Sequence, residues 1–549
     1  AAGPAAPPPT RRPIGASGSA PHSRTTRISP AHFLFSLPQT LSPMRYFLIA
    51  ALFLTFFSCQ PKTESVEEAT PEVKKPRTIV TTDGEIDDVD SFIRMLLYAN
   101  EFQIEGLIYS SSMWHYKGDG KGTRFTSEME MTKTMYGAKT DLRWPGVEWM
   151  NPLLDAYAAV YPKLSQHAAG FPTAEYLRSV VRVGNIDFEG EMEADTEGSD
   201  FIKAKLLDKE MEPIYLQVWG GTNTIARALK SIEDQYKGRP EWESIYNKVV
   251  DKAIIYAILD QDATYRKYIA PNWPDLKIYY NSSQFWCFAY PWKRAVPESQ
   301  QYLFEGKFMG EEIINNHGPL LEQYYSYGDG QVQAGDDEHI HGDPTKLVNA
   351  QWGTFGVYDF ISEGDSPAYL HLIDVGLDNL NQPQWGGWGG RLVQSAEQPN
   401  RWEDGKGVLD FNPFTDTLDA TYPQIRWIEA IQQDFAARAD WCVMDYADAN
   451  HPPVVKAVGA TRLSAKPGEK LSLEVQTSDP DGDQLETKFW IYREVGTYTG
   501  EAGLSASGNK VEVSLDAKAI GQLHVIAEVK DNGVHPMTRY VRFVIEVEF

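Results

Sequence analysis

Residues 78–88 read TIVTTDGEIDD, so a strand-forming run leads directly into a run of acids. The β-branched residues at 78–82 predict a buried strand that ends at Asp83. Apolar residues then recur at helical spacing, which predicts a helix directly after the acids. The apolar positions of this helix are Val89, Phe92, Ile93, Leu96 and Leu97. A strand followed at once by a helix is typical of an α/β sheet, in which ligands bind where the strands end.

The same alternation of strand and helix continues along the chain. Short apolar strands are predicted at residues 104–110, 214–218, 253–258 and 277–280. The second of these leads through a Gly-Gly turn into an apolar helix at 222–229. Strands that alternate with helices indicate an α/β domain around a mostly parallel sheet, which we expect to span residues 77–450.

The pattern changes after the His-Pro-Pro sequence at residues 451–453. Beyond it, apolar and polar residues alternate in four runs separated by turn residues. The runs are Leu471/Leu473/Val475, Val511/Val513/Leu515, Leu523/Val525/Ala527/Val529 and Val541/Phe543/Ile545/Val547. This pattern predicts an all-β immunoglobulin-like sandwich at residues 451–549. The acidic sequence at 479–483 is either an ordinary turn or a calcium site between modules.

Length and charge limit the classes of function. With 549 residues the chain is too long for one ordinary core, so two or more domains are expected. Acidic residues outnumber basic ones by 76 to 51, and the net charge of −25 disfavours a nucleic-acid polymer as partner. Such acidity suits a neutral substrate or a metal cation, although it also serves solubility alone. Cys287 and Cys442 are expected either to pair in an oxidising compartment or to remain buried thiols.

The N-terminal region contains addressing signals. From Met44 the chain reads MRYFLIAALFLTFFSCQ, which is typical of a signal peptide at residues 44–59. Ser58-Cys59 resembles a bacterial lipobox, which implies a lipid on Cys59. The protein is therefore expected outside the cytoplasm, at the periplasmic face or the cell surface of the outer membrane. Residues 60–76 then form a polar tether, and residues 1–43 are interpreted as a non-native upstream extension.

Four acids lie within six positions at the end of the first strand: Asp83, Glu85, Asp87 and Asp88. Their charges repel one another unless something positive lies among them. Carboxylate oxygens suit a hard cation such as Ca²⁺, which accepts about 6–8 oxygen ligands. The alternative is a solvated acidic turn that stabilises the N-terminus of the following helix.

These acids resemble the signature of the calcium-dependent nucleoside hydrolases, in which an Asp-x-x-x-Asp-Asp cluster follows the first strand. Residues 219–226 are similar to that family's Gly-Pro-x-Thr-Asn-Ile-Ala segment, and residues 364–370 to its late His-Asp-Pro segment. The resemblance implies a nucleoside hydrolase-like fold that binds one Ca²⁺. The implied ligands are Asp83, Asp87, Asp88, Asp365 and the backbone carbonyl of Asn223.

Several positions depart from the true nucleoside hydrolases. Gly364 stands where the purine-type enzymes have a His, and residues 110–115 replace a sugar-binding Asn. The ribose-binding segment has no clean counterpart, although residues 260–262 and 272–273 lie in about the right place. This altered pattern, together with the sandwich, resembles a bacterial family of nucleoside hydrolase-like proteins that are often described as cellulose-binding.

The resemblance implies metal-assisted hydrolysis of a glycosyl bond. Ca²⁺ would orient a water molecule and lower its pKa. Asp83 would accept the water's proton as general base. His115, His339 and His341 are the candidate general acids. The last two lie in an acidic loop that could equally be a solvated loop or a second metal site.

Aromatic faces stack on sugar rings, so several aromatic residues are candidates for substrate binding. The predicted substrate-binding residues are Trp114, Asp260, Asn272, Trp273, Trp385 and Trp388. Trp385 and Trp388 flank a Gly-rich run, which favours an exposed stacking platform over a tightly packed loop.

The expected function is calcium-dependent hydrolysis of a glycosyl bond in an extracytoplasmic carbohydrate or glycoside. A non-catalytic carbohydrate-binding lipoprotein is the first alternative. A nucleoside N-ribohydrolase is the second.

Overall fold

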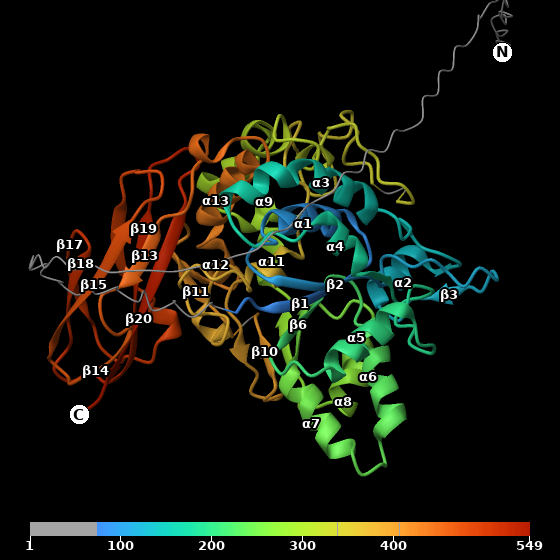
Figure 1. Cartoon of the computed structure of the whole chain (residues 1–549), viewed down its shortest axis with the longest axis horizontal. Helices are drawn as coiled ribbons and strands as arrows, with labels where there is room; N and C mark the ends of the chain where they lie inside the picture. The colour runs from blue at the N-terminus through green and yellow to red at the C-terminus, as the bar shows by residue number, and fades with distance from the viewer. Residues whose placement is uncertain (1–73, 337–338, 406) are drawn as a thin grey trace, which may run out of the picture. The chain divides into compact units, whose positions relative to one another are not determined.

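The computed structural model describes residues 74–549 apart from 337, 338 and 406, and it contains an α/β domain followed by a β-sandwich (Figure 1). The predicted upstream extension, signal peptide and lipidated Cys59, with most of the tether, lie outside the described residues. No helix within the described ranges is both long and apolar enough to cross a membrane.

An eight-stranded sheet forms the centre of the α/β domain. Its strand order is β5-β2-β1-β6-β7-β8-β10-β9, and neighbouring strands run parallel except β9 and β10. The strands are β1 (Arg77–Thr82), β2 (Gln103–Tyr109), β5 (Val181–Val183), β6 (Ile214–Val218), β7 (Ala253–Ile258), β8 (Lys277–Asn281), β9 (Val393–Gln394) and β10 (Arg401–Glu403). β1 lies between β2 and β6 and is buried along its whole length. The predicted mostly parallel sheet is therefore confirmed.

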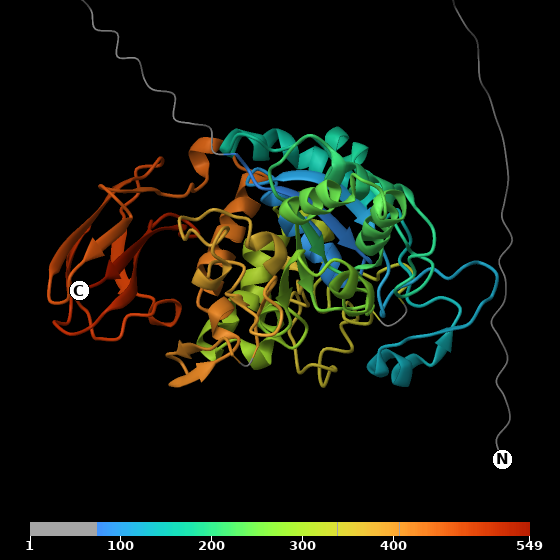
Figure 2. The same cartoon turned by 90° about the horizontal axis from the view of Figure 1, so that it is seen from below.

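The side chains of β1 alternate between the two faces of the sheet, as the pleat of a strand requires. Val80 packs into one apolar core and Ile79 into the other. Helices cover both faces, so the domain has three layers (Figures 1 and 2). On the Val80 face lie α1 (Ile86–Leu97), α3 (Met150–His167), α4 (Ala174–Ser179), α11 (Ser366–Leu370) and α13 (Ile428–Trp441). On the Ile79 face lie α5 (Glu197–Leu207), α6 (Asn223–Tyr236) and α7 (Trp242–Lys252).

Short elements occupy the long connections of the domain. The short strands are β3 (Phe125–Thr126), β4 (Ala138–Lys139), β11 (Asp410–Asn412) and β12 (Thr417–Asp419). The short α-helices are α2 (Glu130–Tyr136), α8 (Ala270–Asn272), α9 (Trp292–Ala295), α10 (Gly306–Phe308) and α12 (Tyr422–Ile425). The other short helical turns are η1 (Tyr265–Ile269), η2 (Gln284–Cys287), η3 (Glu298–Phe304), η4 (Met309–Ile314), η5 (Leu321–Gln323), η6 (Pro383–Trp385), η7 (Tyr446–Asp448) and η8 (Arg493–Val495). In these connections Cys287 is a buried free thiol, and Cys442 after α13 is another.

Two antiparallel-rich sheets form the C-terminal part, in the orders β13-β15-β18-β17 and β14-β20-β19-β16. Their strands are β13 (Val454–Ala457), β14 (Arg462–Ala465), β15 (Lys470–Ser478), β16 (Glu486–Ile491), β17 (Gly503–Ser507), β18 (Lys510–Ser514), β19 (Gly521–Lys530) and β20 (Thr538–Val547). The four predicted alternating runs lie in β15, β18, β19 and β20 and supply the sandwich core. The acidic sequence after β15 is a turn in which Asp479 Oδ1 accepts the backbone N–H groups of Asp481 and Asp483.

A buried ion pair joins the two parts of the chain. Asp434 of α13 accepts hydrogen bonds from Arg438 Nε at 2.9 Å and from Arg539 Nη1 of β20 at 2.9 Å. The apolar core of the α/β domain also includes Tyr492 and Tyr540 of the sandwich. The sandwich is therefore packed into the core of the first domain.

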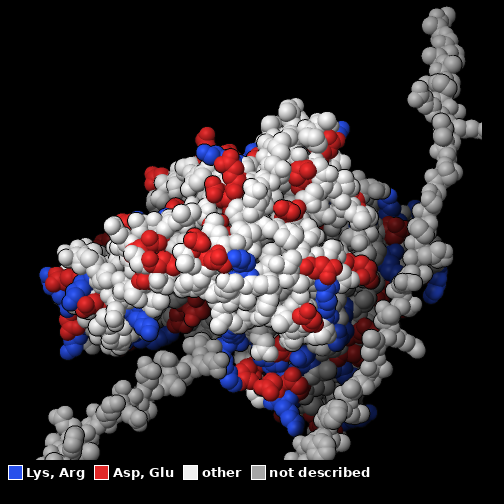
Figure 3. Space-filling view, turned by 45° about the horizontal axis from the view of Figure 1, so that its top comes forward, with Lys and Arg blue, Asp and Glu red and all other residues white. Residues whose placement is uncertain are grey.

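Charged side chains on the surface are interspersed. On the face in Figure 3, the described Lys and Arg residues form no continuous patch, and Asp and Glu residues are scattered between them. This face therefore does not provide the basic surface that a nucleic-acid polymer requires.

We predict that Asp434→Asn lowers the free energy of unfolding by about 3 kcal/mol, because it leaves two arginine charges without their buried partner. Burial opposes the charge of Asp434, but Arg539 and Arg438 hold the pKa of Asp434 below its usual value. The stabilisation is therefore complete above an unfolded-state pKa of about 3.9 and is lost as the pH falls below it. Urea unfolding of wild type and variant between neutral and acidic pH measures both effects. Asp155→Asn, at an exposed ion pair with Arg178, is the control and should change little.

Candidate functional site

Three carboxylates meet at the carboxyl end of β1. Asp87 and Asp88 lie in the first turn of α1, and Asp365 directly precedes α11. One oxygen of each lies within 4.8 Å of the others, and Asp88 and Asp365 are almost completely buried. No side-chain hydrogen bond caps α1 at Glu85, so a simple capping role does not account for this convergence.

The chemistry of these oxygens suits a hard cation. Burial and the neighbouring carboxylates raise the pKa of Asp87, Asp88 and Asp365 well above the usual value. Among the described residues, no Lys or Arg forms an ion pair with any of the three. A divalent cation with oxygen preference would offset the repulsion, and the three residues present fit such an ion.

Asp83 lies beside this group of three and is held by a different set of partners. Ser112 Oγ donates a hydrogen bond to Asp83 Oδ2, and His115 Nδ1 lies 3.3 Å from the same oxygen. Burial opposes the charge of Asp83, but His115 and Ser112 hold the pKa of Asp83 below its usual value. Asp83 is therefore a fixed carboxylate that is ionised at neutral pH. Trp114, which is half-buried, donates its backbone N–H to Ser112 Oγ.

The Gly220-Gly221 turn after β6 allows the loops of the site to approach closely. A Cβ atom on Gly220 would lie 2.9 Å from Asp83 Oδ1, and one on Gly221 would lie 2.4 Å from Asp262 Oδ2. Asp262 accepts the backbone N–H of Asn223 at 2.8 Å. The two glycines thus bring the ends of β1, β6 and β7 together.

Asn223 is the first residue of α6, and its side chain forms hydrogen bonds with residues of the neighbouring loops. Its Nδ2 donates to Ser111 Oγ at 2.9 Å and to the carbonyl of Asn185 at 3.0 Å. Its Oδ1 accepts the backbone N–H of Thr224. Only its backbone carbonyl could therefore serve as the predicted metal ligand.

Several polar side chains gather around Gly84 and Glu85, which directly precede the acidic turn of α1. Arg143 forms a two-point ion pair with Asp336, at 2.9 and 2.8 Å, and lies 3.5 Å from Glu85. Tyr290 donates its hydroxyl hydrogen to Glu85 at 2.9 Å. Gln333 Nε2 donates to the carbonyl of Gly84 at 2.5 Å. The sequence analysis did not assign Arg143, Tyr290 or Gln333 to the site, because no local motif connects them to the acids.

The three candidate histidines differ in environment. Burial and Arg143 oppose the charge of His115, but Asp336 and Asp83 raise the pKa of His115 to about 9. Burial lowers the pKa of His339 to about 3 and that of His341 to about 4. Both ring nitrogens of His339 are buried, and neither has a hydrogen-bond partner among the described residues. The lowered pKa of His339 disfavours it as a general acid at neutral pH, and its assignment stays a prediction.

Trp273 and Asn272 do not reach the carboxylates. Trp273 is buried in the core on the Ile79 face, where it stacks on Tyr246 at 5.1 Å between ring centroids and meets the edge of Trp242. Asn272 lies on the exposed side of α8 and donates to the carbonyl of Tyr268. The expectation that Trp273 binds substrate is therefore wrong, because the segment turns its indole into the core. Asn272 lines a separate surface pocket, and its assignment stays a prediction.

Asp260 lies nearer to the site, at the end of β7. It forms an ion pair with Arg266 at 2.8 Å and lines a surface pocket together with Met113.

The exposed platform expected at Trp385 and Trp388 is also wrong. Both rings are buried: Trp385 meets His524 edge-on at 4.9 Å, and Trp388 is completely enclosed. The glycines around them serve close packing, because a Cβ on Gly389 would lie 2.7 Å from the backbone nitrogen of His371. The Gly-rich run therefore packs against the sandwich and the core.

Comparison with known proteins supports the fold and the altered pattern. Residues 77–392 match the family model described as cellulose-binding Sde182, nucleoside hydrolase-like domain. Residues 470–547 match the model described as the C-terminal domain of the cellulose-binding protein Sde0182. No curated protein matches the chain.

One solved structure also has a nucleoside hydrolase-related fold similar to that of this chain. A nucleoside hydrolase-related hypothetical protein from Saccharophagus degradans, associated with carbohydrate metabolism, is 26% identical with a TM-score of 0.62, and the alignment covers 86% of this chain and 100% of that one. The effector protein XOO4466 is 10% identical with a TM-score of 0.33, over 68% of this chain and 95% of its own. The plant nucleoside hydrolase PpNRh1 is 9% identical with a TM-score of 0.28, over 67% and 99%. The last two likenesses are too weak to support an inference.

We predict that Asp365→Asn raises the melting temperature in the presence of a chelator, by about 2–4 °C, because it removes one of three mutually repelling buried charges. The same substitution should diminish the rise in melting temperature that added CaCl₂ gives the wild type. Thermal unfolding in EDTA and in CaCl₂ measures both. Asp251→Asn, on the exposed side of α7, is the matched control. A variant that melts below the wild type in EDTA and responds equally to calcium contradicts the prediction.

Proposed function

The chain belongs to the family of cellulose-binding Sde182 proteins with a nucleoside hydrolase-like domain, and from this premise we propose that it is a calcium-dependent hydrolase of glycosyl bonds in an extracytoplasmic carbohydrate. The convergence of Asp87, Asp88 and Asp365 carries the proposal, because it places three carboxylates, two of them buried, where a parallel sheet binds its ligands. Asp83 and the backbone carbonyl of Asn223 complete the proposed ligand set. A bound Ca²⁺ supplies positive charge that orients and acidifies a water molecule and accepts sugar hydroxyls.

The side chains around Asp83 have the arrangement that a general base needs. The carboxylate is ionised, and Ser112 and His115 fix its orientation. Asp83 can therefore accept a proton from a water molecule that lies between it and the other three aspartates.

His115 is the proposed proton donor to the leaving group. Its ring lies between Asp83 and Asp336, and its raised pKa of about 9 keeps it protonated at neutral pH. Gly364 supplies no imidazole at the position where the purine-type nucleoside hydrolases have a His, so the leaving-group proton must come from another residue, for which we propose His115.

A carbohydrate-binding protein without turnover is the second candidate. Two observations favour it: Asp88 and Asp365 are almost completely buried, and His115 is completely buried. A sugar reaches these groups only if the side chains around them move. The altered ribose-binding positions make a nucleoside the least favoured substrate.

We predict that Asp83→Asn lowers the rate of glycoside hydrolysis at least about 100-fold, because the amide cannot accept the water's proton. Calcium should still raise the melting temperature of the variant, since the other carboxylates remain. Release of reducing sugar from a panel of oligosaccharides and aryl glycosides measures the rate, with Asp251→Asn as the control. A wild type that shows no turnover on the whole panel in saturating calcium refutes the enzyme and leaves the binding protein. Release of free base from inosine or uridine would instead establish the nucleoside hydrolase.

We also propose that the protein is anchored to the outer membrane by a lipid on Cys59, on the strength of the sequence Met44–Cys59 alone. The expected result is that Cys59→Ser moves the expressed protein from the membrane fraction to the soluble fraction. Fractionation followed by immunoblotting measures the change. Unaltered membrane association of the variant would exclude this anchor.

A further inference from the structure

One short segment contacts the surroundings of the carboxylate site on one side and lines a surface pocket on the other. It runs from η2 through α9, and its inner and outer sides make different contacts. On the inner side, Phe285 packs against Gly364, where a Cβ would lie 3.4 Å from the Phe285 ring, and Tyr290 donates to Glu85. The residues that directly follow them, Trp286 and Pro291, face outward.

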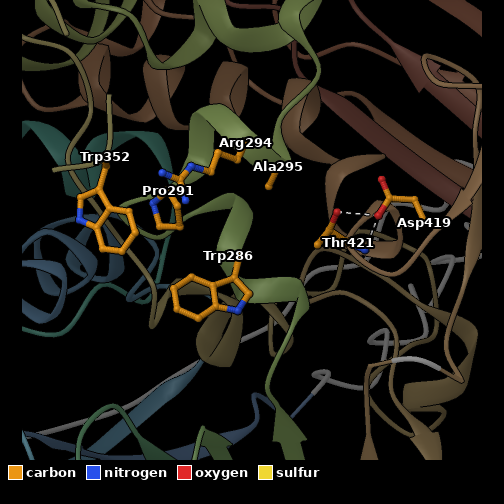
Figure 4. Close-up of a pocket in the computed structure, with 7 residues that line it drawn as sticks. All are labelled: Trp286, Pro291, Arg294, Ala295, Trp352, Asp419 and Thr421. Atoms are coloured by element: carbon orange, nitrogen blue, oxygen red, sulfur yellow. Dashed lines mark hydrogen bonds between the residues drawn. The ribbon is translucent and has the colours of Figure 1, made fainter. Parts of the chain in front are cut away.

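The outer side of this segment forms one wall of a surface pocket of about 380 Å³ (Figure 4). Trp286, Pro291 and Arg294 come from the segment, and Trp352 comes from the loop before α11. Asp419 at the end of β12 and Thr421 directly after it line the same pocket. Its volume lies within the range of small-molecule sites, roughly 300–1,000 Å³.

The two indoles of the pocket are partly open to solvent and are held in place. Trp286 is 38% exposed and lies against Phe285, with 4.4 Å between ring centroids. The guanidinium of Arg294 lies 5.6 Å from the centre of the Trp352 ring. A fixed and exposed indole offers a flat apolar face, which suits the flat face of a pyranose ring.

The polar groups of the pocket suit a neutral polyhydroxyl ligand. Arg294 and Asp419 carry opposite charges, so the pocket has no net charge that would select a phosphate or a uronic acid. Asp419 is oriented by Thr421, whose backbone N–H and hydroxyl both donate to Asp419 Oδ1 at 2.8 Å. A carboxylate, a guanidinium and a hydroxyl around two aromatic faces can pair with the donors and acceptors of sugar hydroxyls.

We propose that this pocket is a carbohydrate subsite that stacks sugar rings on Trp286 and Trp352. The match to a family described as cellulose-binding is the reason for proposing a neutral β-linked glucan as its ligand. The inference rests on the proposed function, which it deepens by naming the substrate class and the surface that holds it. Because the segment from η2 to α9 contacts Glu85 and the Gly364 that precedes Asp365 on its other side, the subsite would hold a glucan chain near the proposed reaction centre.

Isothermal titration of the full chain with cellohexaose tests the subsite. Trp286→Ala and Trp352→Ala should each weaken binding about tenfold, because each removes one stacking face. Trp286→Tyr should restore most of the affinity, since a phenol ring still offers a face. Phe411→Ala is the matched control: Phe411 is an exposed aromatic on the β11–β12 hairpin, but its side chain projects from the face opposite Asp419. Equal melting temperatures establish that the variants are folded.

Two results overturn the subsite: a wild type that does not bind cellohexaose, or alanine variants that bind it as tightly as the wild type does. Neither result bears on the proposed hydrolysis, because the rate of hydrolysis is measured separately on the whole glycoside panel with Asp83→Asn. Tryptophan-dependent binding without any turnover would refute the enzyme and leave the subsite in place.

Discussion

The repulsion among the buried carboxylates at the end of β1 is the constraint on which the rest of the site depends. Three negative groups cannot remain close together in a low-dielectric interior without a counter-charge. The arginines of the neighbourhood are already engaged, Arg94 with Glu363 and Arg143 with Asp336. The fold therefore holds the three carboxylates together, while the nearby arginine side chains form ion pairs with other acidic residues. This arrangement is expected of a site that receives its positive charge from outside the chain.

The local elements of the fold follow closely from the sequence. The predicted strands at 214–218 and 253–258 coincide with β6 and β7, because their apolar runs end in clear turn signals. The short strands β5, β9 and β10 were not predicted, since two or three residues are too few to show a period. The boundary between the domains at residue 450 remains a prediction.

The site was predictable only where its residues share a motif. Asp83, Asp87 and Asp88 lie in one run, and Asp365 was found through the family resemblance alone. Arg143 and Tyr290 reach the acids from distant loops, and no sequence period connects them to β1. For Trp385 and Trp388 the composition of the loop indicated exposure, but the partner that buries them lies in the sandwich. Burial of this kind depends on tertiary contacts that a single segment does not encode.

The position of the sandwich has a consequence for how this architecture could change over evolutionary time. Tyr492, Ile526, Met537 and Tyr540 belong to the same apolar core as the helices of the first domain. The sandwich cannot be lost or exchanged as an independent module, because its removal would expose apolar core residues of the first domain to water. A descendant protein could lose the sandwich only after polar side chains had replaced the apolar residues that the sandwich now covers.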